Sequence, residues 1–259
     1  MNPTPSEADA PSDPIPVAIP TQDGVCRAWL LTPSTPGRWP AVIFYGDAGG
    51  MRPAMTAMAR RLADAGYAVL LPDPYYRYGP YDTLVPAEVF KGDVMAILGP
   101  LMATTGNRQA GEDTRAYVAW LDDCESVRPG PMGAVGFCMG GGMALTAAAA
   151  LPDRFAAVAS FHGGRLATDD PASPHLAVGR LQAEAYVAGA EQDDSCPPEM
   201  AERLEQALID GGVKYTAEIY EGAAHGWMVP DFPVYDPLAA ARGWQAMLEL
   251  FERKLRTAR

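Results

Sequence analysis

A strand–turn–helix pattern around one cysteine constrains the fold of this chain more than any other stretch. Residues 134–137 form an apolar run that suits a buried strand, and residues 143–150 suit a buried helix. Between them lies Gly-Phe-Cys-Met-Gly, the G-x-S-x-G nucleophile motif with Cys138 in place of serine. The backbone at such a turn is sharply bent, so its neighbours must be small, and glycines occupy positions 136, 140 and 141.

The pattern predicts that Cys138 is a nucleophile. The residue would lie at a helix N-terminus, whose partial positive charge favours a thiolate. The alternative is a buried structural cysteine beside a glycine-rich turn. A lone G-x-C-x-G sequence would leave that alternative open, but the flanking strand, helix and glycines together favour the nucleophile.

The bulk composition limits the class of protein. A length of 259 residues suits one large α/β domain, and 48% hydrophobic with 20% charged residues is ordinary for a soluble globular protein. The formal net charge of -12 argues against nucleic acid or an anionic membrane surface as a main partner. No apolar run approaches the length of a membrane span.

The N-terminus and the cysteines bear on the compartment. Residues 1–14 are acidic and proline-rich, without a basic start or an apolar core, so we expect a disordered tail rather than a secretory signal. Residues 15–259 are then a single domain. The cysteines form no C-x-x-C pair and no metal spacing, so we expect a reduced, cytoplasmic protein without a metal; they are Cys26, Cys124, Cys138 and Cys196.

Apolar runs alternate with helical patterns along most of the chain. This alternation predicts an α/β fold with a mostly parallel, doubly wound sheet and helices on both faces. Residues 75–106 are irregular and could form part of a pocket wall. The expected strands are residues 15–19, 25–31, 41–45, 67–71, 134–137, 156–161, 184–188 and 215–220. The expected helices begin near residues 53, 109, 143, 198 and 238, and residues 89–98 are a candidate for a further short helix.

Several chemically active side chains follow these expected strands. Ligands of such sheets bind beyond the carboxyl ends of the strands, so we expect these residues to converge. His175 lies in a polar excursion instead, where we expect it to be solvated. The residues at the strand ends are Asp47, Arg77, Cys138, His162, Asp193 and His225.

Cys138, an acidic residue and His225 occur in the chain order nucleophile, acid, base, which is the order of α/β-hydrolases. The thiolate would attack a carbonyl, His225 would move the proton, and the carboxylate would orient the imidazole. Asp193 and Asp194 both qualify as the acid. His162 could be a pocket wall, a hydrogen-bond donor or, equally, a satisfied structural histidine.

An oxyanion hole would complete such a site with two backbone N–H groups. One should belong to Met139, which directly follows the nucleophile. The other should come from the turn after the strand at residues 41–45, most simply from Ala48.

From about residue 25 to the C-terminus, these features resemble the dienelactone hydrolases, also called carboxymethylenebutenolidases. The resemblance rests on Gly-Phe-Cys-Met-Gly-Gly at 136–141, an aspartate four residues before Pro197, and Gly-Ala-Ala-His-Gly at 222–226. The aspartate spacing matches Asp193 rather than Asp194. The resemblance implies an α/β-hydrolase fold, hydrolysis of an enol lactone that bears a carboxylate, and no cofactor.

The resemblance also implies substrate-binding residues. Arg77 matches a substrate-binding arginine, and its neighbour Tyr76 could pack against a flat ring. Asp47 stands where the family has a glutamate that holds the resting thiol, and its side chain is one methylene shorter. The family's second arginine is absent after His225, where Trp227 stands, so the pocket should be more apolar.

Other functions remain open from the sequence. A general carboxylesterase, a thioesterase or an acyltransferase could use the same fold. A non-catalytic redox sensor could use Cys138 as a reactive thiol, although a sensor needs neither Asp193 nor His225. We expect a monomer that acts on a small-molecule ester or lactone, without a nucleic-acid or membrane partner.

Overall fold

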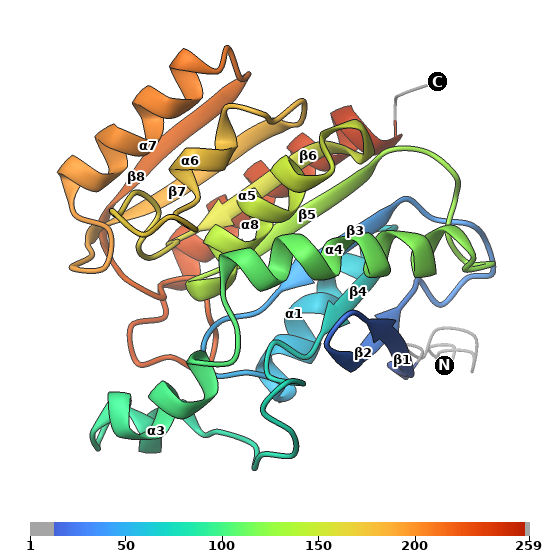
Figure 1. Cartoon of the computed structure of the whole chain (residues 1–259), viewed down its shortest axis with the longest axis horizontal. Helices are drawn as coiled ribbons and strands as arrows, with labels where there is room; N and C mark the ends of the chain where they lie inside the picture. Colours follow the sequence, from blue (N-terminus) through green and yellow to red (C-terminus); the bar gives the residue numbers. More distant parts are fainter. Residues whose placement is uncertain (1–12, 257–259) are drawn as a thin grey trace, which may run out of the picture.

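A mixed sheet of eight strands forms the centre of the computed structural model, which describes residues 13–256 (Figure 1). The strands lie in the order β1-β2-β4-β3-β5-β6-β7-β8. Their bounds are β1 Ile15–Thr21, β2 Gly24–Leu31, β3 Ala41–Tyr45, β4 Ala68–Pro72, β5 Met132–Phe137, β6 Phe155–Phe161, β7 Glu184–Gln192 and β8 Tyr215–Ala224.

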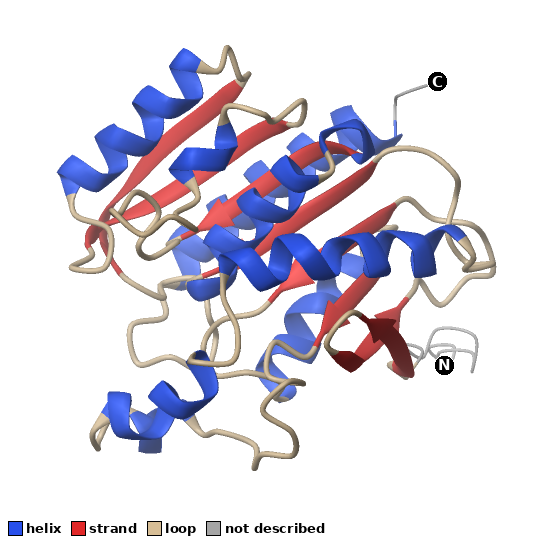
Figure 2. Cartoon of the chain, viewed as in Figure 1, coloured by secondary structure: helices blue, strands red, loops and turns tan. Residues whose placement is uncertain are grey.

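The sheet is parallel from β4 to β8 and antiparallel only at its N-terminal edge. Strands β1 and β2 form a hairpin, which a two-residue turn permits, and β2 pairs antiparallel with β4. The parallel strands need long crossovers, and helices supply these (Figure 2). The mostly parallel, doubly wound α/β sheet predicted from the sequence is confirmed.

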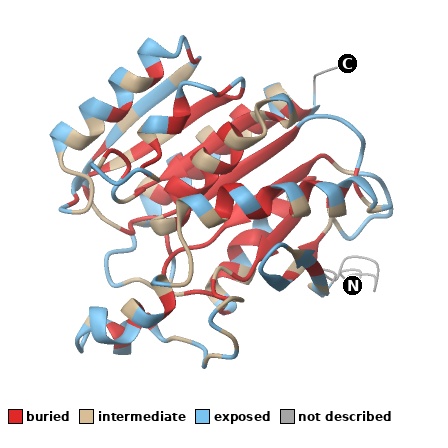
Figure 3. Cartoon of the chain, viewed as in Figure 1, coloured by how far each residue is buried: buried red, intermediate tan, exposed pale blue. Residues whose placement is uncertain are grey.

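Helices cover both faces of the sheet (Figure 1). Successive side chains of β3 point to opposite faces of the sheet. Ile43 and Tyr45 pack in the hydrophobic core on one face, and Val42 and Phe44 pack in the core on the other. Figure 3 shows the central strands buried between these layers. One layer holds α4 (Asn107–Asp122), α5 (Met139–Ala150), α6 (His175–Val178) and α7 (Pro198–Asp210); the other holds α1 (Pro53–Asp64), α8 (Pro237–Phe251) and the π-helical turn η3 (Glu252–Arg256).

The expected elements are present, with differences at their ends. Strands β7 and β8 both continue past the expected residues 188 and 220, to Gln192 and Ala224. A β-bulge interrupts the pairing of the two strands after Ala190, and the pairing resumes at Gln192 and Ala224. The pairing between β7 and β8, rather than the local apolar pattern, therefore sets the length of these strands. A 3-10 turn, η2 (Pro152–Arg154), joins α5 to β6.

The irregular stretch 75–106 folds into two short helices, α2 (Pro86–Val89) and α3 (Val94–Met102). Figure 1 shows α3 projecting from the carboxyl-end side of the sheet. Val89 and Leu98 pack against Ala48 in a small apolar cluster of their own. The segment therefore covers the turn that follows β3, next to the site described below.

The expected disordered tail, residues 1–14, lies outside the described residues except for its last two. Within residues 13–256, no helix has the length and apolar character that a membrane crossing requires.

Candidate active site

The turn between β5 and α5 presents Cys138 at the carboxyl end of the sheet. Cys138 has φ 54° and ψ -119°, a left-handed conformation that L-residues rarely adopt. Glycine is required two residues before and two residues after Cys138. A Cβ at Gly136 would lie 1.8 Å from the carbonyl oxygen of Gly140. A Cβ at Gly140 would lie 2.2 Å from the Tyr45 carbonyl oxygen. The glycines therefore allow the tight bend that exposes the thiol.

Three side chains from three strand ends form one hydrogen-bonded row. Cys138 Sγ lies 3.1 Å from Nε2 of His225, and Nδ1 of His225 lies 2.7 Å from Oδ2 of Asp193. Asp193 follows β7, His225 follows β8, and the His225 amide donates to the Gln192 carbonyl at 3.0 Å. These three residues therefore lie together in the structure, as the sequence predicted.

The structure distinguishes the two candidate acids by position. Asp193 is 8% exposed and points at His225, whereas Asp194 is exposed to solvent. Burial alone would raise the pKa of Asp193, but hydrogen bonds from His225 and Ser195 hold it below its usual value. Asp193 is therefore ionised beside the imidazole.

Ser195 is a member of this row that the sequence did not indicate. Its backbone N–H and its hydroxyl both donate to Oδ1 of Asp193, at 2.9 and 2.5 Å. The hydroxyl oxygen also lies 3.0 Å from Nδ1 of His225. Ser195 thus fixes the plane of the carboxylate so that its other oxygen faces His225.

The imidazole of His225 is in a strongly basic environment. Burial alone would lower its pKa, but hydrogen bonds to Asp193 and Cys138, with the negative charge beside them, raise the pKa to about 10. The surroundings of His225 thus favour a proton on the imidazole, between the Asp193 carboxylate and the Cys138 sulfur.

In the described part of the chain, two residues with unbonded backbone N–H groups line the same cavity as the thiol. Ala48 and Met139 both line it, and neither amide donates a hydrogen bond to another backbone or side-chain group within residues 13–256. The buried Tyr75 hydroxyl donates to the Ala48 carbonyl at 2.7 Å and lies 4.0 Å from the Met139 sulfur. Tyr75 therefore holds the turn that carries one of the two expected oxyanion-hole donors.

Asp47 is paired with an arginine and not with the thiol. Its two carboxylate oxygens accept from Arg52 at 2.6 and 2.8 Å, and one of them also accepts from the Gly49 amide. Arg52 bonds Asp231 as well, at 2.7 and 2.9 Å. Through Arg52, Asp47 thus connects the turn after β3 to the loop that follows His225. The hydrogen-bond partner of Cys138 Sγ is the imidazole of His225 and not Asp47.

Arg77 and Tyr76 lie in a separate polar network. Arg77 binds both oxygens of the buried Asp113 at 2.8 and 2.9 Å and also pairs with Asp23. The Tyr76 hydroxyl contacts Asp113 and Thr21. Neither residue lines the cavity at Cys138, so the structure does not bring them to the thiol as the sequence predicted.

His162 lies behind the nucleophile. Its Nδ1 accepts a hydrogen bond from the Cys138 amide at 3.1 Å, and burial, followed by the nearby His225, lowers its pKa to about 3. His162 is thus a neutral acceptor that supports the turn, and of the three alternatives neither the cavity wall nor a donor to Cys138 describes it. It is a buried structural histidine, although its Nε2 has no hydrogen-bond partner among the described residues. Trp227 is completely buried, stacks on Tyr220 and packs its ring against His162, so it is a core residue rather than a cavity wall.

His175 was expected to be solvated. In the structure its side chain is partly buried and hydrogen-bonded to Ser173.

A cavity of about 440 Å³ opens above Cys138. The segment 75–106 supplies Met102 and Thr105, so its expected role as a pocket wall is confirmed. Two arginines, Arg108 and Arg165, also line the cavity, and Arg108 pairs with Glu112. Arg165 has φ 54°, and no ion pair joins its side chain to another residue within 13–256.

Across the described residues, no group of three or more His, Cys, Asp or Glu side chains is placed to hold a metal ion. A nucleophile on a strand–helix turn, with a histidine and an acid from later strands, defines an α/β-hydrolase.

The comparisons with known proteins place the chain within that class. The sequence profile of the dienelactone hydrolase family matches residues 26–255, and the chain belongs to this family. A "Putative carboxymethylenebutenolidase" of Synechocystis is 28% identical over 93% of this chain and 96% of its own length. The "Carboxymethylenebutenolidase" of Rhodococcus opacus is 27% identical over 96% of each chain.

A solved structure supports the fold. The "Putative Dienelactone Hydrolase" of Klebsiella pneumoniae superposes with a TM-score of 0.82 at 24% identity. The match covers 93% of this chain and 98% of that one.

Proposed function

We propose that this protein hydrolyses a small ester or lactone through a covalent thioester on Cys138. His225 is the general base and acid, and Asp193 orients it. The observation that carries the proposal is the unbroken row of hydrogen bonds, 3.1 Å from Sγ to Nε2 and 2.7 Å from Nδ1 to Oδ2. Family membership makes a hydrolase the expected class of enzyme.

In the first half-reaction the sulfur attacks the substrate carbonyl carbon, and the thiol proton resides on Nε2 of His225. The carbonyl electrons move to the oxygen, which receives hydrogen bonds from the amides of Ala48 and Met139. When the tetrahedral adduct collapses, the carbon–oxygen bond of the ester breaks. His225 returns its proton to the leaving oxygen, which stays tethered if the substrate is a lactone.

In the second half-reaction a water molecule attacks the thioester. His225 Nε2 accepts a proton from this water, and the same two amides hold the second oxyanion. Collapse breaks the carbon–sulfur bond, the sulfur recovers the proton, and a carboxylic acid leaves. Asp193 keeps its negative charge throughout and stabilises the imidazolium that forms in each step.

The cavity supports a substrate of modest size. Its volume of about 440 Å³ suits a small molecule, and Arg108 and Arg165 give it positive charge beside a single carboxylate, Asp170. The name of the Rhodococcus relative, carboxymethylenebutenolidase, refers to an unsaturated lactone. We therefore propose lactones and activated esters as the substrate class.

A general carboxylesterase is the second candidate. The position of Arg77 favours it, because the arginine expected to read a substrate carboxylate is held by Asp113 and Asp23. A hydrolysis screen separates the two, with a dienelactone, neutral lactones and neutral aryl esters as substrates. Preference for the dienelactone supports the lactonase, and preference for aryl esters supports the esterase. Activity that persists in full in Asp193→Asn would contradict both.

A further inference from the structure

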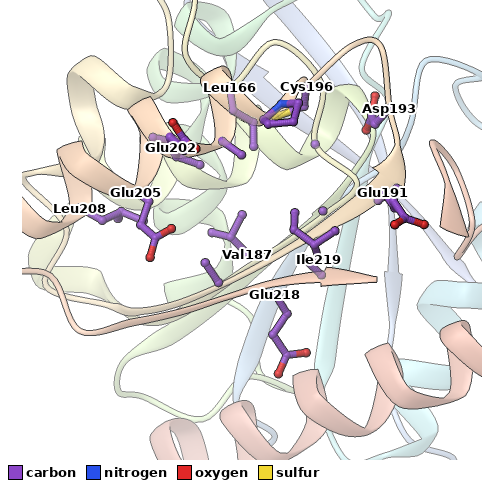
Figure 4. A pocket seen from close by; sticks show the side chains of 18 residues that line it. Leu166, Val187, Glu191, Asp193, Cys196, Glu202, Glu205, Leu208, Glu218 and Ile219 are labelled. Atoms are coloured by element: carbon purple, nitrogen blue, oxygen red, sulfur yellow. The ribbon is translucent and has the colours of Figure 1, made fainter. Parts of the chain in front are cut away.

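A second cavity lies on the other side of the segment that carries the catalytic acid. Its volume is about 330 Å³, and it opens between α7 and the strands β7 and β8 (Figure 4). None of its lining residues lines the cavity above Cys138. Residues 193–196 separate the two cavities. Asp193 and Cys196 line the second cavity, and Ser195 lines the cavity above Cys138.

Small and branched apolar residues make up the walls. Figure 4 shows Val187 and Ile219 on the sheet side, with Leu208 on α7 across the gap. Two alanines, Ala201 on α7 and Ala217 on β8, also line the cavity, and larger side chains at these positions would occupy part of its volume. Ile219 is 57% exposed at this edge of the sheet, so apolar surface remains uncovered on the described chain.

Among the described residues, all charged ones that line this cavity are acidic, and no lysine, arginine or histidine lines it. The five carboxylates are those of Glu191, Asp193, Glu202, Glu205 and Glu218. Some are engaged elsewhere: Glu218 points away from the cavity and pairs with Arg242, and Glu205 accepts from the Tyr215 hydroxyl (Figure 4). The side chain of Glu202 has neither a hydrogen bond nor an ion pair with another residue of the described chain.

We propose that this cavity is a binding site for a small apolar cation, such as an amine that carries an aromatic ring or a branched alkyl group. The ring would replace water against Val187, Leu208 and Ile219, where burial of apolar surface is favourable. The ammonium would lie at the mouth near Glu202 and Glu205. A second copy of this chain does not suit the cavity, because a two-fold contact would bring the same carboxylates together.

Direct binding measurements test the site with three probes of similar size and different charge. These are phenethylammonium, phenethyl alcohol and phenylacetate, each titrated calorimetrically into the full chain with Cys138 alkylated to close the catalytic site. We expect phenethylammonium to bind about tenfold more tightly than the alcohol, as one or two partly exposed ion pairs allow, and phenylacetate to bind most weakly. Equal affinity for the three probes would overturn the proposal.

Variants then locate the binding. Ala201→Leu fills the cavity from α7, and Ala217→Leu fills it from β8 if the first variant is poorly folded; either should abolish binding. The double variant Glu202→Gln with Glu205→Gln should remove the preference for the amine and keep the affinity for the alcohol. Glu199→Gln, on the same helix but outside the lining, is the matched control and should change neither. Binding that survives both filling variants would place the amine elsewhere.

Discussion

At the residue scale, Ser195 holds the Asp193 carboxylate of the proposed triad. Its hydroxyl supplies a second hydrogen bond to the Asp193 oxygen that does not face His225. We expect Ser195→Ala to lower kcat about tenfold or more with little change in KM, because a hydrogen bond to a charged group contributes ~1.5–3 kcal/mol. Asp194→Asn, an exposed neighbour, is the control. Unchanged kcat in Ser195→Ala would show that the backbone N–H of residue 195 is sufficient.

Arg165 lies at the cavity beside Cys138, where the sequence led us to expect Arg77. Arg165 lines the catalytic cavity, whereas Arg77 neutralises the buried Asp113. We expect Arg165→Gln to lower kcat/KM about tenfold on a carboxylate-bearing lactone and hardly at all on a neutral ester. Arg77→Gln should lower the melting temperature and leave the ratio of the two activities unchanged, since it strands a buried charge. If only Arg77→Gln changes that ratio, the original assignment of Arg77 is correct.

Sequence could predict some of these residues and not others. Cys138 and His225 follow strands and sit between glycines, so local pattern and chain order indicate them. Ser195 belongs to an Asp-Asp-Ser turn that any surface loop could contain. Arg165 lies in an excursion whose path back over the cavity depends on tertiary contacts, such as its amide hydrogen bond to the Ser195 carbonyl.

At the element scale, a buried ion pair positions the turn after β3. Arg52 is 4% exposed and joins Asp47 on this turn to Asp231 on the loop after His225. The turn carries Ala48, and the loop continues from His225, the proposed general base. The ion pairs of Arg52 thus fix the positions of two elements that flank the proposed site.

This arrangement makes a prediction for Asp47→Asn. We expect kcat to fall about tenfold, because the Ala48 amide loses its fixed direction, and the free energy of unfolding to fall by ~3 kcal/mol. The rate of iodoacetamide modification at Cys138 should stay unchanged, because Asp47 does not contact the thiol in the structure. Mass spectrometry of the modified protein measures that rate. Faster modification would instead mean that Asp47 restrains the resting thiol.

At the scale of the whole molecule, alternating apolar runs were enough to predict the sheet and its two helical layers. The buried strands are short and continuous in sequence, and β3 runs over residues 41–45 as expected. The extensions of β7 and β8 come from their mutual pairing, which no local window contains. Segment 75–106 lacks periodicity, and its position depends on contacts with Ala48 and Met139.

The buried, neutral His162 links global stability to pH. Its pKa falls from 6.5 to about 3 on folding, so between these values the unfolded chain binds more protons than the folded one. Stability should therefore decrease as pH falls through this window. We expect the advantage of wild type over His162→Asn in free energy of unfolding to shrink by at most ~1.4 kcal/mol per pH unit. Urea denaturation of both proteins across the window measures this, and a constant difference would contradict a neutral buried His162.

We propose that hydrolysis passes through a thioester on Cys138. The most direct measurement is intact-protein mass spectrometry of samples quenched in acid during turnover of an aryl ester. We expect an added acyl mass that hydroxylamine removes, and digestion of the same samples should place it on the peptide that contains Cys138. We also expect Cys138→Ala to have neither adduct nor turnover while it remains folded. Hydrolysis by Cys138→Ala at the wild-type rate would contradict the account.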